Sequence, residues 1–293
     1  MSALLLHVTA VERLAAQVST VAPEFSKALG EDLEYARFGA ALPELPALGG
    51  WAHGVGSWFG GGERPRFARR LLEHAPVGFG LKAAELVANG ALVGTEAGLA
   101  FVAGYFTQLC VRRSLEPLVA TVMPRARKPN ESDGAFRARL EWSWSLSLLQ
   151  ELHGTTMVGT PAVRTKLLVR KEAGPWGIGR GFYELIRVSS QEALGEAPQK
   201  ADVDSWMRGL YLAALALGSP LGRLKLLGSA IEGQQELFRG PGVDVWRAVE
   251  DGLTHTREVL TVLGGLIRRG SFSARSRGKV LAVCPEAGAP RAA

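Results

Sequence analysis

Cysteine and histidine are scarce in this sequence. Their spacing does not fit a disulfide framework or the metal sites in which these residues stand a few positions apart. The two cysteines, Cys110 and Cys284, stand far apart, and neither has a Cys or His at metal-ligand spacing. They do not indicate a disulfide framework, and Cys110, inside an apolar run, is typical of a small core residue. No two histidines are spaced i, i+4, which excludes a metalloprotease-type helix. The five are His7, His53, His74, His153 and His255.

Long hydrophobic runs and targeting features are also missing. The longest apolar stretch, Gly98–Val111, is too short and too rich in glycine to span a bilayer. Residues 1–17 lack the basic segment and the apolar core of a signal peptide. We therefore expect a cytoplasmic protein without a transmembrane segment.

Short motifs that often bind phosphate or carry catalysis lack their structural context. Gly54 and Gly56, and the Gly177–Gly181 pattern, do not follow a predicted strand, which a phosphate-binding loop requires. We interpret these glycines as turn residues. No serine, Ser57 included, lies in the context of a nucleophile elbow.

Apolar residues at helical spacing are present in almost every long segment. Hydrophobic residues make up 47% and charged residues 21% of the chain, which predicts a packed core. No segment shows convincing strand alternation, and Val280–Val283 is only the nearest candidate. The chain is therefore predicted to be all-α, a single multi-helix bundle domain over residues 1–270. Residues 271–293, basic and then rich in Ala and Pro, are expected to form a partly disordered tail.

Glycine, proline and polar residues set the limits of the predicted helices. These helices cover residues 3–21, 29–38, 66–88, 94–123, 134–153, 161–170, 181–194, 202–217, 221–238 and 243–269. Loops are expected over Gly39–Pro46, which carries two prolines, and over Gly49–Arg66, which is rich in Gly and Trp. Asp202 or Asp204 is the expected N-cap of the helix that follows Pro198.

The net charge of +6 favours solubility, with some attraction to phosphates or acidic surfaces. The basic residues are scattered except near the C-terminus, where several of them could contact an anionic surface or nucleic acid. A solvated helix end and tail is the favoured interpretation. The sequence leaves open whether the chain binds a protein partner. The C-terminal basic residues are Arg268, Arg269, Arg275, Arg277 and Lys279.

One stretch resembles a known family. Residues 100–119 read AFVAGYFTQLCVRRSLEPLV, which is similar to the central helix of the bacterial zinc-dependent phospholipase C family, a helical fold related to the P1-type nucleases. That helix reads roughly Gly-Tyr-x-x-His-Leu-x-x-Asp-x-x-x-His-Pro in the family. Segments around His7, Glu44 and His74, and residues 151–161, resemble further family segments in the same order. The resemblance implies a helical bundle whose zinc ligands point into the core.

The resemblance also implies a chemistry, from which this sequence departs. In the family, His, Asp and His on one helical face help to hold zinc ions that activate water and clamp a phosphate ester. Gln108, Arg112 and Glu116 stand at those three positions here. A guanidinium cannot bind zinc, and its positive charge opposes a dication. Glu44 stands where an Asp is expected and could still be a ligand.

These departures favour a non-catalytic role without a cofactor, in which a degenerate member of the family uses its vacated site as a structural or binding pocket. One alternative is an active phosphodiesterase or phospholipase with a reduced zinc site built on His7, Glu44 and His74. A second is a helical interaction module unrelated to that family. The residues expected to mark the pocket are His7, Glu44, His74, Gln108, Arg112 and Glu116.

A family member that lost its zinc ions would keep buried ligands without a counter-charge, which is energetically costly. Substitutions that exchange charged residues along the same helix would then be expected. Arg112 and Glu116 are spaced i, i+4 and can meet on one helical face. We predict that Arg112 pairs with Glu116, Glu44 or both, inside the vacated metal pocket; the alternative is that Arg112 and Glu116 face solvent. A single cleft is predicted to be lined by His7, Glu44, His74 and Gln108.

Overall fold

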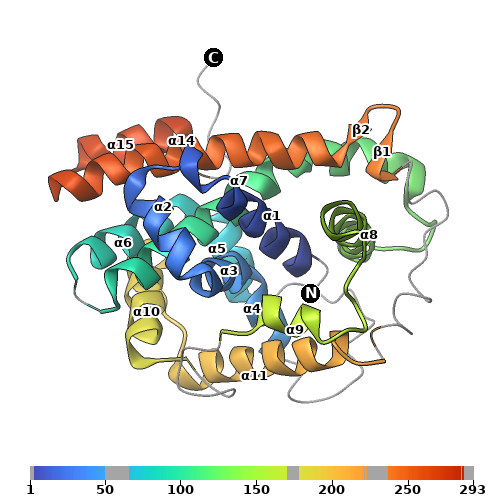
Figure 1. Cartoon of the computed structure of the whole chain (residues 1–293), viewed down its shortest axis with the longest axis horizontal. Coiled ribbons are helices and arrows are strands. Elements are labelled where there is room, and N and C mark those ends of the chain that lie inside the picture. Colours follow the sequence, from blue (N-terminus) through green and yellow to red (C-terminus); the bar gives the residue numbers. More distant parts are fainter. Residues whose placement is uncertain are drawn as a thin grey trace.

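The computed structural model describes residues 3–49, 66–90, 92–169, 178–220, 222, 237–284 and 286. Within these ranges the chain is mostly helical, which confirms the all-α prediction (Figure 1). The one sheet in this part of the chain is a two-stranded antiparallel hairpin of β1 (Arg239–Gly240) and β2 (Val243–Asp244). Several features that the sequence singled out lie outside the described residues: His53, Gly54, Gly56, Ser57, Gly177 and most of the helix expected over 221–238.

The helices form one connected hydrophobic core to which elements from both ends of the chain contribute. Figure 1 shows α14 and α15 along one edge of the molecule and α11 along the opposite edge. The α-helices are α1 (Leu4–Ala16), α2 (Pro23–Glu31), α3 (Leu33–Ala41), α4 (Leu45–Gly49), α5 (Arg66–Glu73), α6 (Pro76–Ala88), α7 (Thr95–Ala126), α8 (Asp133–His153), α9 (Ala162–Leu167), α10 (Arg180–Leu194), α11 (Lys200–Leu217), α14 (Val245–Arg269) and α15 (Ala274–Val283). Two short 3-10 turns are η1 (Val18–Thr20) and η2 (Leu42–Glu44).

Helix α7 is the centre of the fold. Every residue from Gly98 to Val111 is buried, as in a helix that is surrounded by neighbours on all sides. Helices α1, α2, α3, α6 and α14 all pack against it. The residues of the family-like stretch therefore lie on the most buried element of the described chain.

Prolines explain two of the differences from the predicted boundaries. The helix expected over 66–88 is divided into α5 and α6 because Pro76 begins a new helix. The loop expected over Gly39–Pro46 is wrong: the chain continues through the end of α3, then η2 and α4. Pro43 and Pro46 lie in the first turns of η2 and α4, where a missing backbone N–H disrupts no hydrogen bond.

Helix α11 begins earlier than predicted. Its N-cap is Gln199, not Asp202 or Asp204, and Asp202 takes part as the third helical residue of a capping box. The carboxylate of Asp202 accepts a hydrogen bond of 3.0 Å from the Gln199 backbone N–H. The first turn of α11 is therefore closed on its own polar side chains.

The C-terminal segment expected to be a partly disordered tail contains a helix. Residues 274–283 form α15, so the stretch Val280–Val283 is helical and not a strand. Gly270 ends α14 with φ of 60°, which lets the chain reverse, and the Ser273 side chain caps the new helix. Val280 is buried, and α15 packs on α14. The helical domain thus extends past residue 270.

Two of the C-terminal basic residues are paired within the fold. Arg268 on α14 pairs with Glu24 on α2, and Arg277 on α15 lies 2.8 Å from Glu85 on α6. These pairs attach the last helices to the body of the molecule. Within the described ranges, no helix has both the length and the apolar character needed to cross a membrane.

Candidate functional site

The six residues predicted to mark the pocket differ in their burial. His7 on α1, Glu44 in η2 and Gln108 on α7 are all buried. Arg112 and Glu116 follow Gln108 along α7 at intervals of one turn, and both are partly exposed. His74 comes directly after α5 and is exposed. Among the described residues, no three His, Cys, Asp or Glu side chains are arranged to hold a metal ion, so His7, Glu44 and His74 do not form such a group.

Arg112 and Glu116 belong to a cluster of four charged residues between α7 and α8, which we call the α7–α8 charge cluster: Arg112, Glu116, Arg137 and Glu141. Arg112 Nε lies 3.5 Å from Glu116 Oε1, which confirms the contact between them, while the side chain of Glu116 is 45% exposed and therefore only partly buried. The second partner of Glu116 was not predicted. Arg137 donates from Nη1 to Glu116 Oε2 at 2.9 Å and from Nη2 to Oε1 at 2.8 Å. Its Nε donates to Glu141 Oε1 at 2.7 Å.

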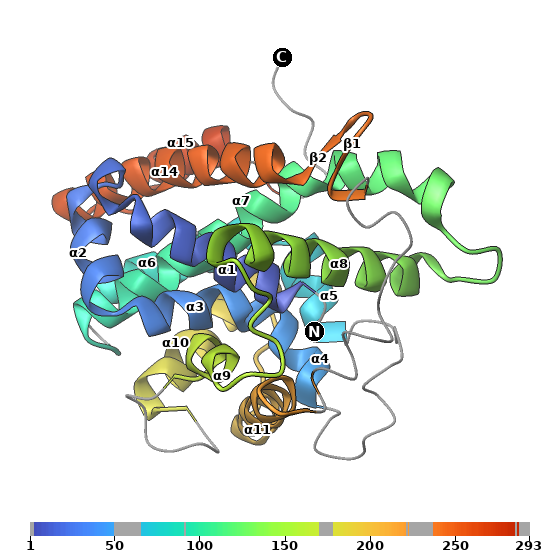
Figure 2. The same ribbon diagram turned by 45° about the vertical axis from the view of Figure 1, so that its right-hand side comes forward.

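The geometry of two neighbouring helices builds the α7–α8 charge cluster. Arg112 and Glu116 are one turn apart on α7, and Arg137 and Glu141 are one turn apart on α8. Figure 2 shows α7 and α8 side by side, joined by the turn at residues 127–132. The sequence signal for the full cluster was therefore two opposite-charge i, i+4 pairs on consecutive helices.

Arg137 is the centre of the α7–α8 charge cluster. Its side chain is 21% exposed and that of Glu141 is 8% exposed. Burial by itself lowers the pKa of Arg137, but Glu141 and Glu116 together raise that pKa above its ordinary value. The guanidinium therefore stays charged, and its planar fork fixes both carboxylates.

These residues do not fit a zinc cluster. At the first family position, Gln108 offers only a weak amide ligand, and at the second, Arg112 has no lone pair for a metal. At the third, both carboxylate oxygens of Glu116 accept hydrogen bonds from Arg137. The positive charge of two guanidiniums also opposes a dication at this place.

Gln108 is a second unusual feature of α7. The residue has no exposed surface, and neither its amide nitrogen nor its amide oxygen has a hydrogen-bond partner among the described residues. Buried amides of this kind are rare because they lose their bonds to water without replacement. Its neighbour Thr107, by contrast, donates to the Ala103 carbonyl at 2.7 Å.

Replacing this amide by an apolar side chain should stabilise the protein. We expect Gln108→Leu to raise the free energy of unfolding by about 1 kcal/mol, because it removes an unsatisfied buried polar group of similar size. Urea denaturation followed by circular dichroism measures the change. The matched control is Gln150→Leu on α8, where the exposed glutamine donates to the Gly154 carbonyl at 2.8 Å. That control should be neutral or slightly destabilising; a clear loss of stability in Gln108→Leu would show that the amide is needed in the core.

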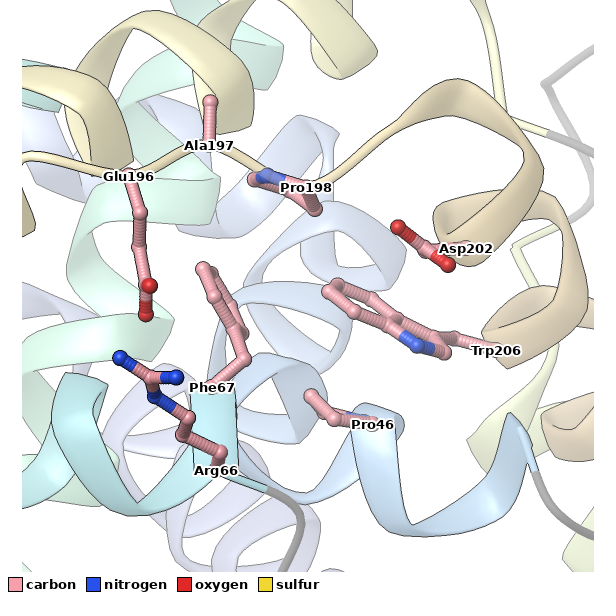
Figure 3. Close-up of a pocket in the computed structure, with 8 residues that line it drawn as sticks. All are labelled: Pro46, Arg66, Phe67, Glu196, Ala197, Pro198, Asp202 and Trp206. Carbon is pink, nitrogen blue, oxygen red and sulfur yellow. The ribbon is translucent and has the colours of Figure 1, made fainter.

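A pocket of about 320 Å³ lies between α4, α5, α11 and the segment that precedes α11 (Figure 3). Its floor is aromatic: the rings of Phe67 and Trp206 have centroids 5.3 Å apart. Figure 3 shows Arg66 and Glu196 pointing toward one another on one side and Asp202 beside Trp206 on the other. The lining residues are Pro46, Arg66, Phe67, Glu196, Ala197, Pro198, Asp202 and Trp206.

Sequence reasoning missed this pocket. Trp206 was interpreted as a core residue, and it is indeed buried, but one face of its ring borders the pocket. The charged residues at the rim come from α5, α11 and the turn after α10, which no local pattern connects. Apolar walls with a few charged groups at the rim are typical of sites that bind small molecules.

Comparisons with known proteins give no match for this chain. No protein-family model, no curated protein and no solved structure matches it.

Proposed function

We propose that this chain is a non-catalytic protein, resembling a degenerate zinc-dependent phospholipase C, that has a structural or binding role. The observation that carries the proposal is the pairing of Glu116 with Arg137. At the third family position the chain has a carboxylate with both oxygens bound by a guanidinium, at 2.8 and 2.9 Å. Arg112 adds a second positive charge at the position before it.

The chemistry of hydrolysis explains why this pairing supports the proposal. A carboxylate that acts as a metal ligand or general base must have an oxygen lone pair directed at the metal or at the proton it takes. In the α7–α8 charge cluster the carboxylates of Glu116 and Glu141 are directed at Arg137 instead. An arginine that is held by two carboxylates fixes the packing of α7 on α8, which is a structural role.

The pocket beside Trp206 supports the binding part of the proposal. Its volume of about 320 Å³ is at the lower end of the range for small-molecule sites. A flat apolar ligand would contact Phe67 and Trp206, and a polar group on it would reach Arg66 or Asp202 at the rim. The pocket and the α7–α8 charge cluster involve different helices, so loss of one need not affect the other.

Metal content and hydrolytic activity test the proposal together. The purified full chain should contain far less than one zinc ion per molecule by mass spectrometry of the metals. It should not hydrolyse bis(p-nitrophenyl) phosphate or p-nitrophenyl phosphorylcholine above the rate of buffer, with or without added Zn²⁺. A zinc-dependent phospholipase C assayed in parallel is the positive control.

The active alternative makes the opposite prediction. If His7, Glu44 and His74 formed a reduced metal site, zinc would bind stoichiometrically and the phosphodiester would be hydrolysed. His7→Ala and His74→Ala would then each abolish the zinc-dependent rate. Zinc-dependent hydrolysis that disappears in these variants would overturn the non-catalytic proposal.

A further inference from the structure

The two cysteines, which the sequence separates widely, meet in the fold. Cys110 lies on α7 and Cys284 directly follows α15, and both are buried as free thiols. Arg113, one turn after Cys110 on α7, contacts Cys284 Sγ, which places the two thiols on the same side of α7, and each thiol shifts the pKa of the other. Thr256 on α14 lowers the pKa of Cys110, so α14 also lies beside the pair.

Arg113 provides a positive charge at the same place. It follows Cys110 by three positions on α7, which puts both residues on one helical face. Its Nη1 lies 2.7 Å from Cys284 Sγ. Its Nη2 is buried and has no hydrogen-bond partner among the described residues, and no carboxylate in that part of the chain forms an ion pair with it. The sulfur of Cys284 is therefore the group that this guanidinium contacts, and the positive charge would stabilise a thiolate there.

The environment shifts the pKa values of the two thiols in opposite directions. The hydrogen bond from Cys110 lowers the pKa of Cys284, and the charge of Arg113 lowers it further, against the opposing effects of burial and of Glu286. The same hydrogen bond, together with burial, raises the pKa of Cys110 well above its ordinary value. Cys284 is thus the nucleophile of the pair, and Cys110 is the neutral thiol beside it.

The segment that carries Cys284 is attached to the body of the protein at two further points. Arg277 on α15 lies 2.8 Å from Glu85 on α6. The carboxylate of Glu286 accepts hydrogen bonds from the backbone N–H groups of Val77 and Gly78, at 3.0 and 2.7 Å, in the first turn of α6. Cys284 therefore lies between two anchors, which hold its sulfur next to α7.

We propose that Cys284 and Cys110 form a redox-active dithiol, which a peroxide closes to a disulfide that fixes α15 to α7. The Cys284 thiolate attacks one oxygen of hydrogen peroxide, the O–O bond breaks, and a sulfenic acid and hydroxide form. The sulfur of Cys110 then attacks the Cys284 sulfur; the S–S bond forms as the S–O bond breaks. The departing hydroxide takes the Cys110 proton and leaves as water. The hydroxide released in the first step takes up the proton that Cys284 lost when it became a thiolate. Two thiols thus lose two electrons in all, and one peroxide becomes two waters.

The access route to the pair is short. Ala282 is exposed and Val283 is half-buried, so the buried Cys284 at the end of α15 lies next to exposed chain. Hydrogen peroxide is small enough to reach such a sulfur through a brief local opening beside the exposed Ala282. The disulfide would remove the thiolate from Arg113 and replace a polar contact between α15 and α7 by a covalent bond.

Thiol counting and mass spectrometry test this proposal on the full chain. Reduced protein should have two titratable thiols after denaturation, none after treatment with hydrogen peroxide, and two again after a reductant. A tryptic digest under non-reducing conditions should contain the peptides of Cys110 and Cys284 linked to one another. Trypsin should also cleave more slowly at Arg275, Arg277 and Lys279 in the oxidised protein, because α15 can no longer separate from α7.

Three variants assign the roles of the residues. Cys110→Ser should leave a sulfenic acid on Cys284 that dimedone traps, whereas Cys284→Ser should leave Cys110 unmodified. Arg113→Gln should slow the alkylation of Cys284 at neutral pH about tenfold, because the thiolate loses its cation. Three results would each overturn the proposal: two thiols that persist in peroxide, disulfides that form only between molecules, or a sulfinic acid without a cross-link. The wild-type cross-link decides the question even if a variant does not fold.

Discussion

Gly104→Ala should be among the most destabilising single substitutions in this protein, with a loss of about 3–5 kcal/mol in the free energy of unfolding. Gly104 lies where α7 crosses α3. A Cβ atom there would lie 2.6 Å from the carbonyl carbon of Ala36 and closer still to its oxygen. Both partners are helix backbone, so no side chain can move aside. The two helices would have to separate along their contact, and urea denaturation followed by circular dichroism measures the cost.

The same crossing predicts a second sensitive position and a matched control. A Cβ at Gly39 on α3 would lie 2.8 Å from the carbonyl carbon of Phe101 on α7, so Gly39→Ala should also be strongly destabilising. Gly134, near the start of α8, is exposed, and a methyl group added there would meet no described atom within 4 Å. Gly134→Ala should therefore stabilise α8 by up to about 1 kcal/mol. Equal effects at Gly104 and Gly134 would contradict the close crossing.

The crossing also illustrates what helical periodicity could predict. The spacing of apolar residues predicted a long helix over 94–123, and α7 spans Thr95–Ala126. It did not predict that Gly39 and Gly104 lie at the contact of α3 with α7, because a pattern along one helix contains no information about its neighbour. The error at Gly39–Pro46 had a local cause: proline was interpreted as a helix breaker, although it is well tolerated in the first turn.

In the candidate site, too, some contacts could be predicted from the sequence and others could not. The pair of Arg112 and Glu116 was predictable because both residues lie one turn apart on α7. The hydrogen bonds from Arg137 to Glu116 join residues on different helices and depend on how α8 packs on α7. The contact of Cys110 with Cys284 depends on α15, which was expected to be a partly disordered tail. Contacts within one helix could be read from the sequence, and contacts between helices could not.

Arg137→Ala should cost about 2–3 kcal/mol, less than the loss of a partner from a fully buried ion pair, because Glu116 is 45% exposed. The substitution removes three hydrogen bonds to Glu116 and Glu141 and leaves two negative charges close together, that of Glu141 on a side chain only 8% exposed. Arg137→Lys should recover part of the loss, because it keeps the charge but cannot bind both oxygens of Glu116. Urea denaturation at neutral pH gives the comparison.

An exposed arginine provides the control for Arg137→Ala, and removal of one carboxylate separates charge from packing. Arg239 lies 2.9 Å from Glu151 with its side chain 51% exposed, so Arg239→Ala should change the free energy of unfolding by less than about 1 kcal/mol. If repulsion between the carboxylates of Glu116 and Glu141 causes the loss in Arg137→Ala, a protein that also carries Glu141→Gln should lose less on this substitution. A loss that is the same with and without Glu141→Gln would mean that Arg137 acts mainly through its packing, and the α7–α8 charge cluster would no longer support the loss of a metal site by exchange of charge.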